Sequence, residues 1–327
     1  MDFYTGLGTK ITVENAASGV GYSAPWITAI HRGWVAGAKE NTVPALWLTK
    51  EHGYDWAECD IRFTADDVPV LAHNTTVVSE DGATSLTVAD STLEQLQSVT
   101  LQTHTRFGAI GVATLKEALD LARLIGLGLL LDCKDSHFDT DHNKILARTV
   151  LESGWADHVV YMPKKPEGAA AILSVDHNAS FDFVEQAPGT VDTIPDLAPY
   201  QALLTGGNTV GFDINAGYVT NEDFPEVART LREAGLNLSF WNVTASNCAA
   251  VMDLGPLRIT KHNGSDKTDL DRTYFSGRQS WLFSSAPAYR RGIFSWNWKV
   301  FHQILGQINI YFPNILCFDS IRRIPVL

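Results

Sequence analysis

The stretch Trp56-Ala57-Glu58-Cys59-Asp60-Ile61-Arg62-Phe63 places apolar and charged residues at alternating positions. Successive side chains of a β-strand point to opposite faces, so the alternation predicts a strand with two different faces. The apolar face suits a cover of helices and holds Ala57, Cys59, Ile61 and Phe63. The other face is expected to point into the interior of a barrel and carries Trp56, Glu58, Asp60 and Arg62.

Short apolar runs alternate with helical patterns on both sides of this strand. Strands are expected at residues 27–31, 56–63, 129–133, 158–162, 181–185, 210–214, 236–243 and 257–261. Helical patterns lie between them at residues 43–52, 115–124, 144–153 and 221–234. Gly126 and Gly235 follow two of these patterns and are typical helix ends. The alternation favours a (β/α)8 TIM barrel over residues 1–275. The main alternative is a doubly wound sheet, and the lack of a glycine-rich phosphate fingerprint after the first strand weakens it.

Composition excludes several classes of protein. The 327 residues are 45% hydrophobic and 19% charged, which is typical of a globular protein. The formal net charge of −12 disfavours a nucleic-acid partner but allows a small phosphate in a locally basic pocket. The four cysteines are far apart, which suggests reduced thiols in a cytoplasmic protein. We expect no signal peptide and no membrane span.

Residues 276–327 differ in composition from the rest and are interpreted as a C-terminal extension. They are rich in arginine and tryptophan and include Lys299, with Asp319 the one acidic residue. Apolar residues at helical spacing predict one amphipathic helix there, formed by Phe294, Trp298, Phe301, Leu305 and Ile308. It either packs on the barrel or makes a weak contact with a membrane surface.

The charged face of residues 56–63 gives the first chemical hypothesis. Charges inside a barrel are unfavourable unless they are paired or bound to metal. The strand at 129–133 repeats the pattern and places Asp132 and Lys134 on one face. Glu58, Asp60 and Asp132 form an all-oxygen set, which favours Mg²⁺ or Ca²⁺. The alternative is an internal salt-bridge network that also includes Arg62 and Lys134.

Two histidines add acid–base chemistry to this set. His31 ends the first expected strand, where barrel active sites lie, and His73 follows the apolar run at 68–72. One histidine can act as base on an attacking oxygen and the other as acid on a leaving oxygen. Arg32 can bind phosphate oxygens through two hydrogen bonds. The remaining histidines are interpreted as structural.

Together these motifs resemble the glycerophosphodiester phosphodiesterase family, within the superfamily of phosphodiesterases similar to phosphatidylinositol-phospholipase C. The matching segments run in order through residues 27–262. They are His31-Arg32-Gly33, Glu40-Asn41-Thr42, Glu58-x-Asp60-x-Arg62-x-Thr64, Asp67-Val68-Pro69-Val70-x-x-His73, Thr114-Leu115-x-Glu117-Ala118-Leu119, Leu131-Asp132-Cys133-Lys134, Trp241-Asn242-Val243 and Ile259-Thr260.

The resemblance implies a (β/α)8 barrel that hydrolyses a glycerophosphodiester to glycerol 3-phosphate and an alcohol, with a divalent cation, Mg²⁺ or Ca²⁺. By motif, the metal ligands are Glu58, Asp60 and Asp132, and the acid–base pair is His31 and His73. The substrate contacts are Arg32 and Lys134 on the phosphate and Trp241 on the glycerol, although Trp241 also fits a core position. Glu40-Asn41-Thr42 resembles a turn behind the family's metal ligands, and its role can equally be to cap the helix that follows.

Three positions depart from the family pattern. Asn74 stands where the family usually has Asp after the second histidine, and Asp132 stands where Glu is common. Lys261 replaces the acidic residue that commonly follows the last-strand Thr. Two alternatives therefore remain: a phospholipase similar to sphingomyelinase D, which forms a cyclic phosphate, and a catalytically silent barrel that binds phosphodiesters or lipids.

Overall fold

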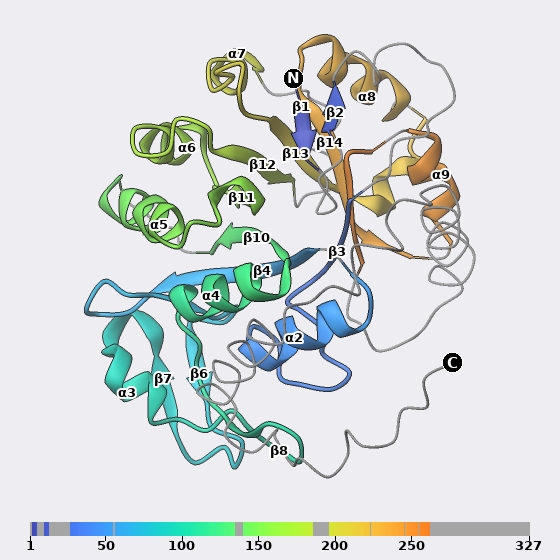
Figure 1. The fold of residues 1–327 in the computed structure, drawn as a ribbon. Helices are drawn as coiled ribbons and strands as arrows, with labels where there is room; N and C mark the ends of the chain where they lie inside the picture. Colours follow the sequence, from blue (N-terminus) through green and yellow to red (C-terminus); the bar gives the residue numbers. More distant parts are fainter. Residues whose placement is uncertain are drawn as a thin grey trace, which may run out of the picture.

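Eight parallel strands close into a barrel in the computed structural model, with helices around its outside (Figure 1). The structure describes residues 2–4, 10–12, 27–54, 56–134, 140–185, 196–222, 224–244, 246–254 and 256–261. In barrel order the strands are β3 (Ile27–Ile30), β4 (Trp56–Phe63), β10 (Gly128–Cys133), β11 (Val159–Met162), β12 (Ser180–Glu185), β13 (Val210–Asn215), β14 (Asn237–Val243) and β15 (Arg258–Lys261). β15 pairs with β3 and so closes the ring. The fold is the (β/α)8 TIM barrel that the sequence predicts.

Helices follow the barrel strands in sequence and cover the outside of the sheet (Figure 1). They are α2 (Val43–Glu51), α4 (Leu115–Ile125), α5 (Thr140–Glu152), α6 (Pro166–Leu173), α7 (Ala198–Gln201), α8 (Phe224–Glu233) and α9 (Cys248–Asp253). Helix α4 begins at a capping box of Thr114 and Glu117 and ends at Gly126, whose φ of 67° is readily adopted by glycine. No described helix has the length and apolar character needed to cross a bilayer.

Short elements between β4 and α4 form an insertion on one side of the barrel. β5 (Pro69–Leu71) pairs antiparallel with the end of β4. Beyond it lie two antiparallel strand pairs, a 3₁₀ turn and a short helix: β6 (Thr76–Val78), β7 (Ser85–Thr87), Val88–Asp90, α3 (Leu93–Gln97), β8 (Gln102–His104) and β9 (Gly108–Ile110). Apart from the barrel, β1 (Asp2–Tyr4) pairs with β2 (Lys10–Thr12). Further 3₁₀ turns span Ala156–His158 and Ala216–Thr220.

The strands and helices expected within residues 27–261 appear with small shifts at their ends. The clearest difference is α5, which begins at Thr140, one turn before the expected residue 144. Helix α8 begins at Phe224 because residue 221 lies in the preceding turn. The extension at 276–327 and its amphipathic helix fall outside the described residues.

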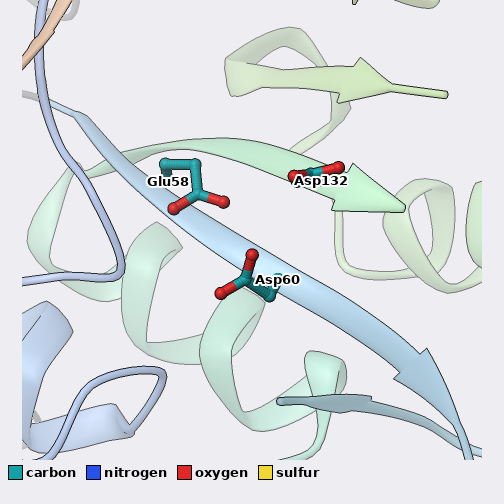
Figure 2. A group of neighbouring side chains, drawn as sticks. All are labelled: Glu58, Asp60 and Asp132. Carbon is teal, nitrogen blue, oxygen red and sulfur yellow. The ribbon is translucent and has the colours of Figure 1, made fainter. Parts of the chain in front are cut away.

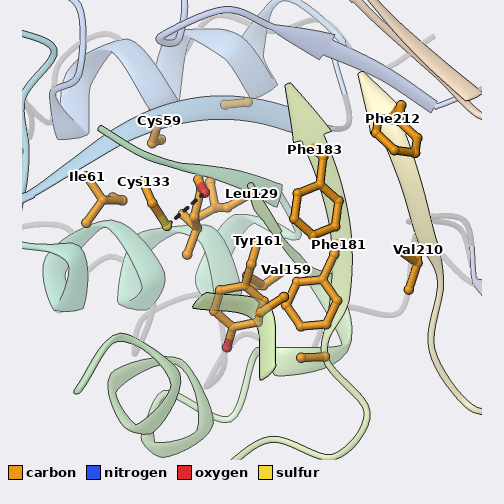
Figure 3. Packing of buried hydrophobic residues seen from close by; sticks show 14 of the residues in the cluster. Cys59, Ile61, Leu129, Cys133, Val159, Tyr161, Phe181, Phe183, Val210 and Phe212 are labelled. Carbon is orange, nitrogen blue, oxygen red and sulfur yellow. Dashed lines mark hydrogen bonds between the residues drawn. The ribbon is translucent and has the colours of Figure 1, made fainter. Parts of the chain in front are cut away.

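The main core lies between the outer face of the barrel and the helices. It contains the apolar face of β4, including Cys59 and Ile61, and aromatic side chains such as Tyr161, Phe181 and Phe212 (Figure 3). A smaller apolar cluster occupies the inside of the barrel and consists of Ala29, Trp56, Leu130, Val160 and Met162. The charged face of β4 therefore points inward, as its alternation predicts.

Candidate metal centre and active site

Three carboxylates from two adjacent strands lie together inside the barrel. Glu58 and Asp60 are two residues apart on β4, and Asp132 is directly opposite Asp60 on β10 (Figure 2). One oxygen from each carboxylate lies within 4.8 Å of the others, and the three residues are 4%, 0% and 4% exposed. Strand alternation and strand register alone thus bring the expected ligand set together.

Burial and neighbouring charges act differently on Glu58 and Asp60. Burial raises the pKa of Glu58 well above its usual value, and the charges of Asp60 and Asp132 raise it further. Burial acts in the same direction on Asp60, but Lys134, Asn41 and Arg32 together lower the pKa of its carboxyl below the usual value. These contacts therefore favour the ionised form of Asp60.

Two lysines bind the carboxylates. The Lys134 ammonium lies 2.5 Å from Asp132 Oδ2 and 2.9 Å from Asp60 Oδ1. Burial alone would lower the pKa of Lys134, but the two carboxylates raise it above its ordinary value. Lys164 lies 2.6 Å from Asp132 Oδ1. Lys164 is not anticipated from the sequence, although its position just beyond an expected strand is a usable signal.

The donor set fits a hard divalent cation. Carboxylate oxygens are the ligands that Mg²⁺ and Ca²⁺ prefer, whereas structural zinc sites use sulfur and nitrogen. The three carboxylates come from rigid strands and are buried, so their separation is set by the sheet rather than by loops. The salt-bridge network considered as the alternative is also present in part, because Lys134 joins Asp60 to Asp132.

His31 and Arg32 leave the carboxyl end of β3 beside Glu58. His31 Nε2 is 3.8 Å from Glu58 Oε2, and the imidazole is one-fifth exposed. The backbone N–H of Arg32 donates to Glu58 Oε2 at 2.9 Å, and Arg32 has an unusual φ of 59°. The Arg32 guanidinium lies 3.2 Å from both Glu40 and Asp60. A Cβ at Gly33 would lie 3.0 Å from Ala45, so the turn needs glycine there.

His73 reaches the same region through the β4–β5 hairpin. The N–H of Ala72 donates to the carbonyl of Asp60 at 2.9 Å, so the main chain just before His73 lies beside β4. Arg62 donates to the His73 carbonyl at 3.0 and 2.7 Å through Nε and Nη2 and so fixes the backbone there. His73 Nδ1 is 3.0 Å from Asn74 Oδ1. The amide oxygen of Asn74 thus contacts the imidazole of the preceding residue.

Neighbouring residues in the turn before α2 have the two roles expected for this turn, capping of the helix and support of the metal ligands. Thr42 is the N-cap of α2, and its side chain accepts from the Ala45 N–H. Asn41 instead binds Asp60, and Glu40 binds Arg32. Capping and support of the carboxylates are thus both present.

Trp241 lies near the carboxyl end of β14. It is two residues from Ser239, which is buried and faces the inside of the barrel beside Asp182, so the two side chains share a face. Trp241 is half-buried. This position is compatible with a wall of the site.

A further set of charges inside the barrel was not anticipated from the sequence. Arg258 of β15 forms an ion pair with Asp182 of β12, and both side chains are buried. Asp213 of β13 is 2% exposed beside this pair, and burial, then the Asp182 charge, raise the pKa of Asp213 well above its usual value. No local motif marks these residues, because they come from separate strands.

Several other histidines make structural contacts. His52 stacks on Trp34 at 3.9 Å between ring centroids, and His158 stacks on Trp155 at 3.8 Å. His142 stacks on Phe63 and lies 3.1 Å from Asp67. These contacts agree with the structural interpretation of these residues.

The fold and the site define a (β/α)8 barrel with a buried three-carboxylate centre near the carboxyl ends of its strands. Residues 31–255 match the model of the glycerophosphoryl diester phosphodiesterase family, and the chain belongs to that family. Among curated proteins, glycerophosphodiester phosphodiesterase 1 of Mus musculus is 36% identical over 109 residues, which cover 32% of each chain. The match thus spans about a third of that relative's length.

Solved structures share the fold at low identity. A glycerophosphodiester phosphodiesterase from Parabacteroides distasonis has a TM-score of 0.56 at 20% identity, covering 80% of this chain and 98% of the other. A phosphodiesterase from Oleispira antarctica, solved in complex with the product sn-glycerol-3-phosphate, has a TM-score of 0.57 at 17% identity, covering 73% and 93%.

Proposed function

We propose that the protein hydrolyses glycerophosphodiesters to glycerol 3-phosphate and an alcohol, with a divalent cation and two histidines. The observation that carries the proposal is the buried carboxylate cluster with His31 beside it, 3.8 Å from Glu58, in a chain of this family. The name of the mouse relative and the product bound to the Oleispira antarctica phosphodiesterase support the choice of substrate class.

We assign Glu58, Asp60 and Asp132 to hold Mg²⁺ or Ca²⁺. When bound, the cation supplies Lewis-acid stabilisation of the phosphate charge. Arg32 and Lys134 donate hydrogen bonds to phosphate oxygens, and charge-assisted bonds of this kind stabilise the charged transition state. Trp241 lines the pocket for the glycerol group.

His31 and His73 move the protons. One takes a proton from the nucleophile, which is either water or the glycerol hydroxyl of the substrate. The other gives a proton to the leaving alcohol. Arg62 supports the second histidine by fixing the carbonyl of His73.

Phosphorus-31 NMR with mixed glycerophosphodiesters and lysophospholipids tests the proposal. We expect a phosphate monoester to accumulate with Mg²⁺ or Ca²⁺ and to stop accumulating when chelator is added. A persistent cyclic phosphate would instead assign the protein to the phospholipases similar to sphingomyelinase D. No turnover by a folded protein that binds the cation would favour the silent barrel.

Two expectations about the surroundings of the protein stay predictions. They are the cytoplasmic location and a weak membrane contact through residues 276–327. Deletion of the residues after Arg278, followed by vesicle binding, tests the second: equal binding by the shortened and the full chain would contradict it.

A further inference from the structure

Lys164 is a charged residue at the site to which the proposed function gives no role. Its ammonium lies 2.6 Å from Asp132 Oδ1, while Lys134 lies 2.5 Å from Asp132 Oδ2. Lys134 follows β10 directly, whereas Lys164 comes from the end of the next strand, β11. Each oxygen of one proposed metal ligand is therefore paired with a different lysine.

The main chain on both sides of Lys164 is restricted. Pro163 precedes it and is buried, and Pro166 is the first residue of α6. The proline rings fix φ at both positions, so the segment between β11 and α6 presents Lys164 in a defined place. Its side chain is 34% exposed, whereas that of Asp132 is 6% exposed. The ammonium thus reaches a buried carboxylate from the solvent side.

The two lysines differ in how firmly they are held. Lys134 binds Asp60 as well as Asp132 and is 14% exposed. Lys164 forms its ion pair with Asp132, and its side chain is more exposed than that of Lys134. A cation that coordinates Asp132 competes with Lys164 for the oxygen, and Lys164 is the lysine that can move away. A freed ammonium beside the site is a point charge well suited to a phosphate oxygen.

We propose that Lys164 exchanges its contact with Asp132 for the substrate's phosphate when the divalent cation binds, and so serves as a second lysine contact to the phosphodiester. This inference rests on the proposed function for the identity of the anion. The proposal predicts two opposite effects of Lys164. It weakens binding of the cation alone, and it strengthens the subsequent binding of the phosphate compound.

The variant K164Q separates these effects, and K165Q is the matched control, because Lys165 is the next residue and is exposed. Calorimetric titration with CaCl₂ alone should show K164Q binding the ion about threefold more tightly than the parent, since a competing ion pair is gone. Titration with sn-glycerol 3-phosphate in saturating Ca²⁺ should show binding weakened on the order of tenfold, the loss of one charge-assisted hydrogen bond. K165Q should leave both affinities unchanged, and K164R should restore most of the phosphate affinity.

Only a change in opposite directions supports the assignment. If K164Q matches K165Q, or if both affinities fall together, Lys164 has no exchange role and the proposal is overturned. A thermal melt of K164Q alongside the parent shows whether the fold is retained. The proposed function fails separately: a parent protein that binds Ca²⁺ and glycerol 3-phosphate but hydrolyses no glycerophosphodiester would overturn that function and leave the Lys164 assignment standing.

Discussion

Asn41 binds Asp60 through both ends of its side-chain amide. Its Nδ2 donates to Asp60 Oδ2 at 2.7 Å, and its Oδ1 accepts from the Asp60 backbone N–H at 2.9 Å. Asn41 has a φ of 55°, in the left-handed region that asparagine tolerates better than most residues. Both partners are buried, so this pair fixes the direction in which the Asp60 carboxylate points, and the bond from Asn41 helps to lower the pKa of that carboxyl.

Replacing Asn41 with alanine should loosen that carboxylate. Two buried hydrogen bonds are lost and their partners on Asp60 are left unsatisfied, so we expect destabilisation of about 1–3 kcal/mol. Loss of an orienting partner should also weaken Ca²⁺ binding on the order of 10–100-fold, measured by calorimetric titration. T42A is the control, because Thr42 caps α2 and should affect stability by about 1 kcal/mol without changing Ca²⁺ affinity. Equal losses of Ca²⁺ affinity in both variants would contradict the orienting role.

Removal of either histidine should slow hydrolysis. A positioned acid or base contributes on the order of 10²–10⁴-fold, so H31A and H73A should each lose that much turnover in the phosphorus-31 NMR assay. H177A is a suitable control, because His177 contacts the Leu173 carbonyl at the outer helix α6. Activity retained in both single variants would mean that the proton transfers use other groups.

Asn74 offers a way to tell the acid from the base. Its amide oxygen lies 3.0 Å from His73 Nδ1, and an aspartate there would stabilise the protonated imidazole. In the variant N74D, the limb of the pH–rate profile that His73 controls should move to higher pH. Movement of the ascending limb identifies His73 as the base, and movement of the descending limb identifies it as the acid. If neither limb moves, titration of His73 does not control the rate.

The sequence was sufficient for the parts of the site that follow from strand geometry. Alternation on β4 put Glu58 and Asp60 on one face, and the parallel register of β10 placed Asp132 opposite Asp60. His73 was reached by the resemblance, and the β4–β5 hairpin explains its place. These features depend on neighbouring residues or on the regular pairing of adjacent strands.

Contacts that depend on the closed barrel were not predictable in the same way. Asp182 and Arg258 pair across the inside from strands far apart in sequence. Lys164 reaches Asp132 with a long, flexible side chain whose direction no periodicity fixes. In each case the contact forms only when the barrel closes and brings the two residues together. The pattern of residues along the sequence does not show which strands or loops will meet.

The raised pKa of Asp213 predicts a pH-dependent difference in stability. Burial is the largest cause, followed by repulsion from Asp182; Arg258 opposes the shift, and Asp132 adds to it. An acid with a raised folded pKa binds more protons in the folded state, so stability is lost as pH rises above the unfolded value of about 3.9. The variant D213N has no such titration. The free energy of unfolding of D213N, relative to that of the parent, should therefore increase as the pH increases from about 4, by at most about 1.4 kcal/mol per pH unit.

Urea unfolding between pH 4 and pH 8 measures this difference. D182N is the contrasting variant, because it leaves the buried Arg258 without its carboxylate and should lose about 3–5 kcal/mol. A constant difference between D213N and the parent at all pH values would show that Asp213 titrates alike in both states.

Gly128 lies against the indole of Trp56 inside the barrel, and a substitution there tests how tightly this region is packed. A Cβ at Gly128 would lie 2.2 Å from a Trp56 ring carbon, so alanine requires the indole to move. Trp56 is 4% exposed inside the barrel, and we expect G128A to destabilise the protein by roughly 1–3 kcal/mol in urea unfolding. G111A is the control, because its nearest contact would be at 3.6 Å. If steric conflict is the cause, G128A should be less destabilising when Trp56 is replaced by leucine. Additive losses in that double-mutant cycle would locate the effect in the backbone rather than in the indole.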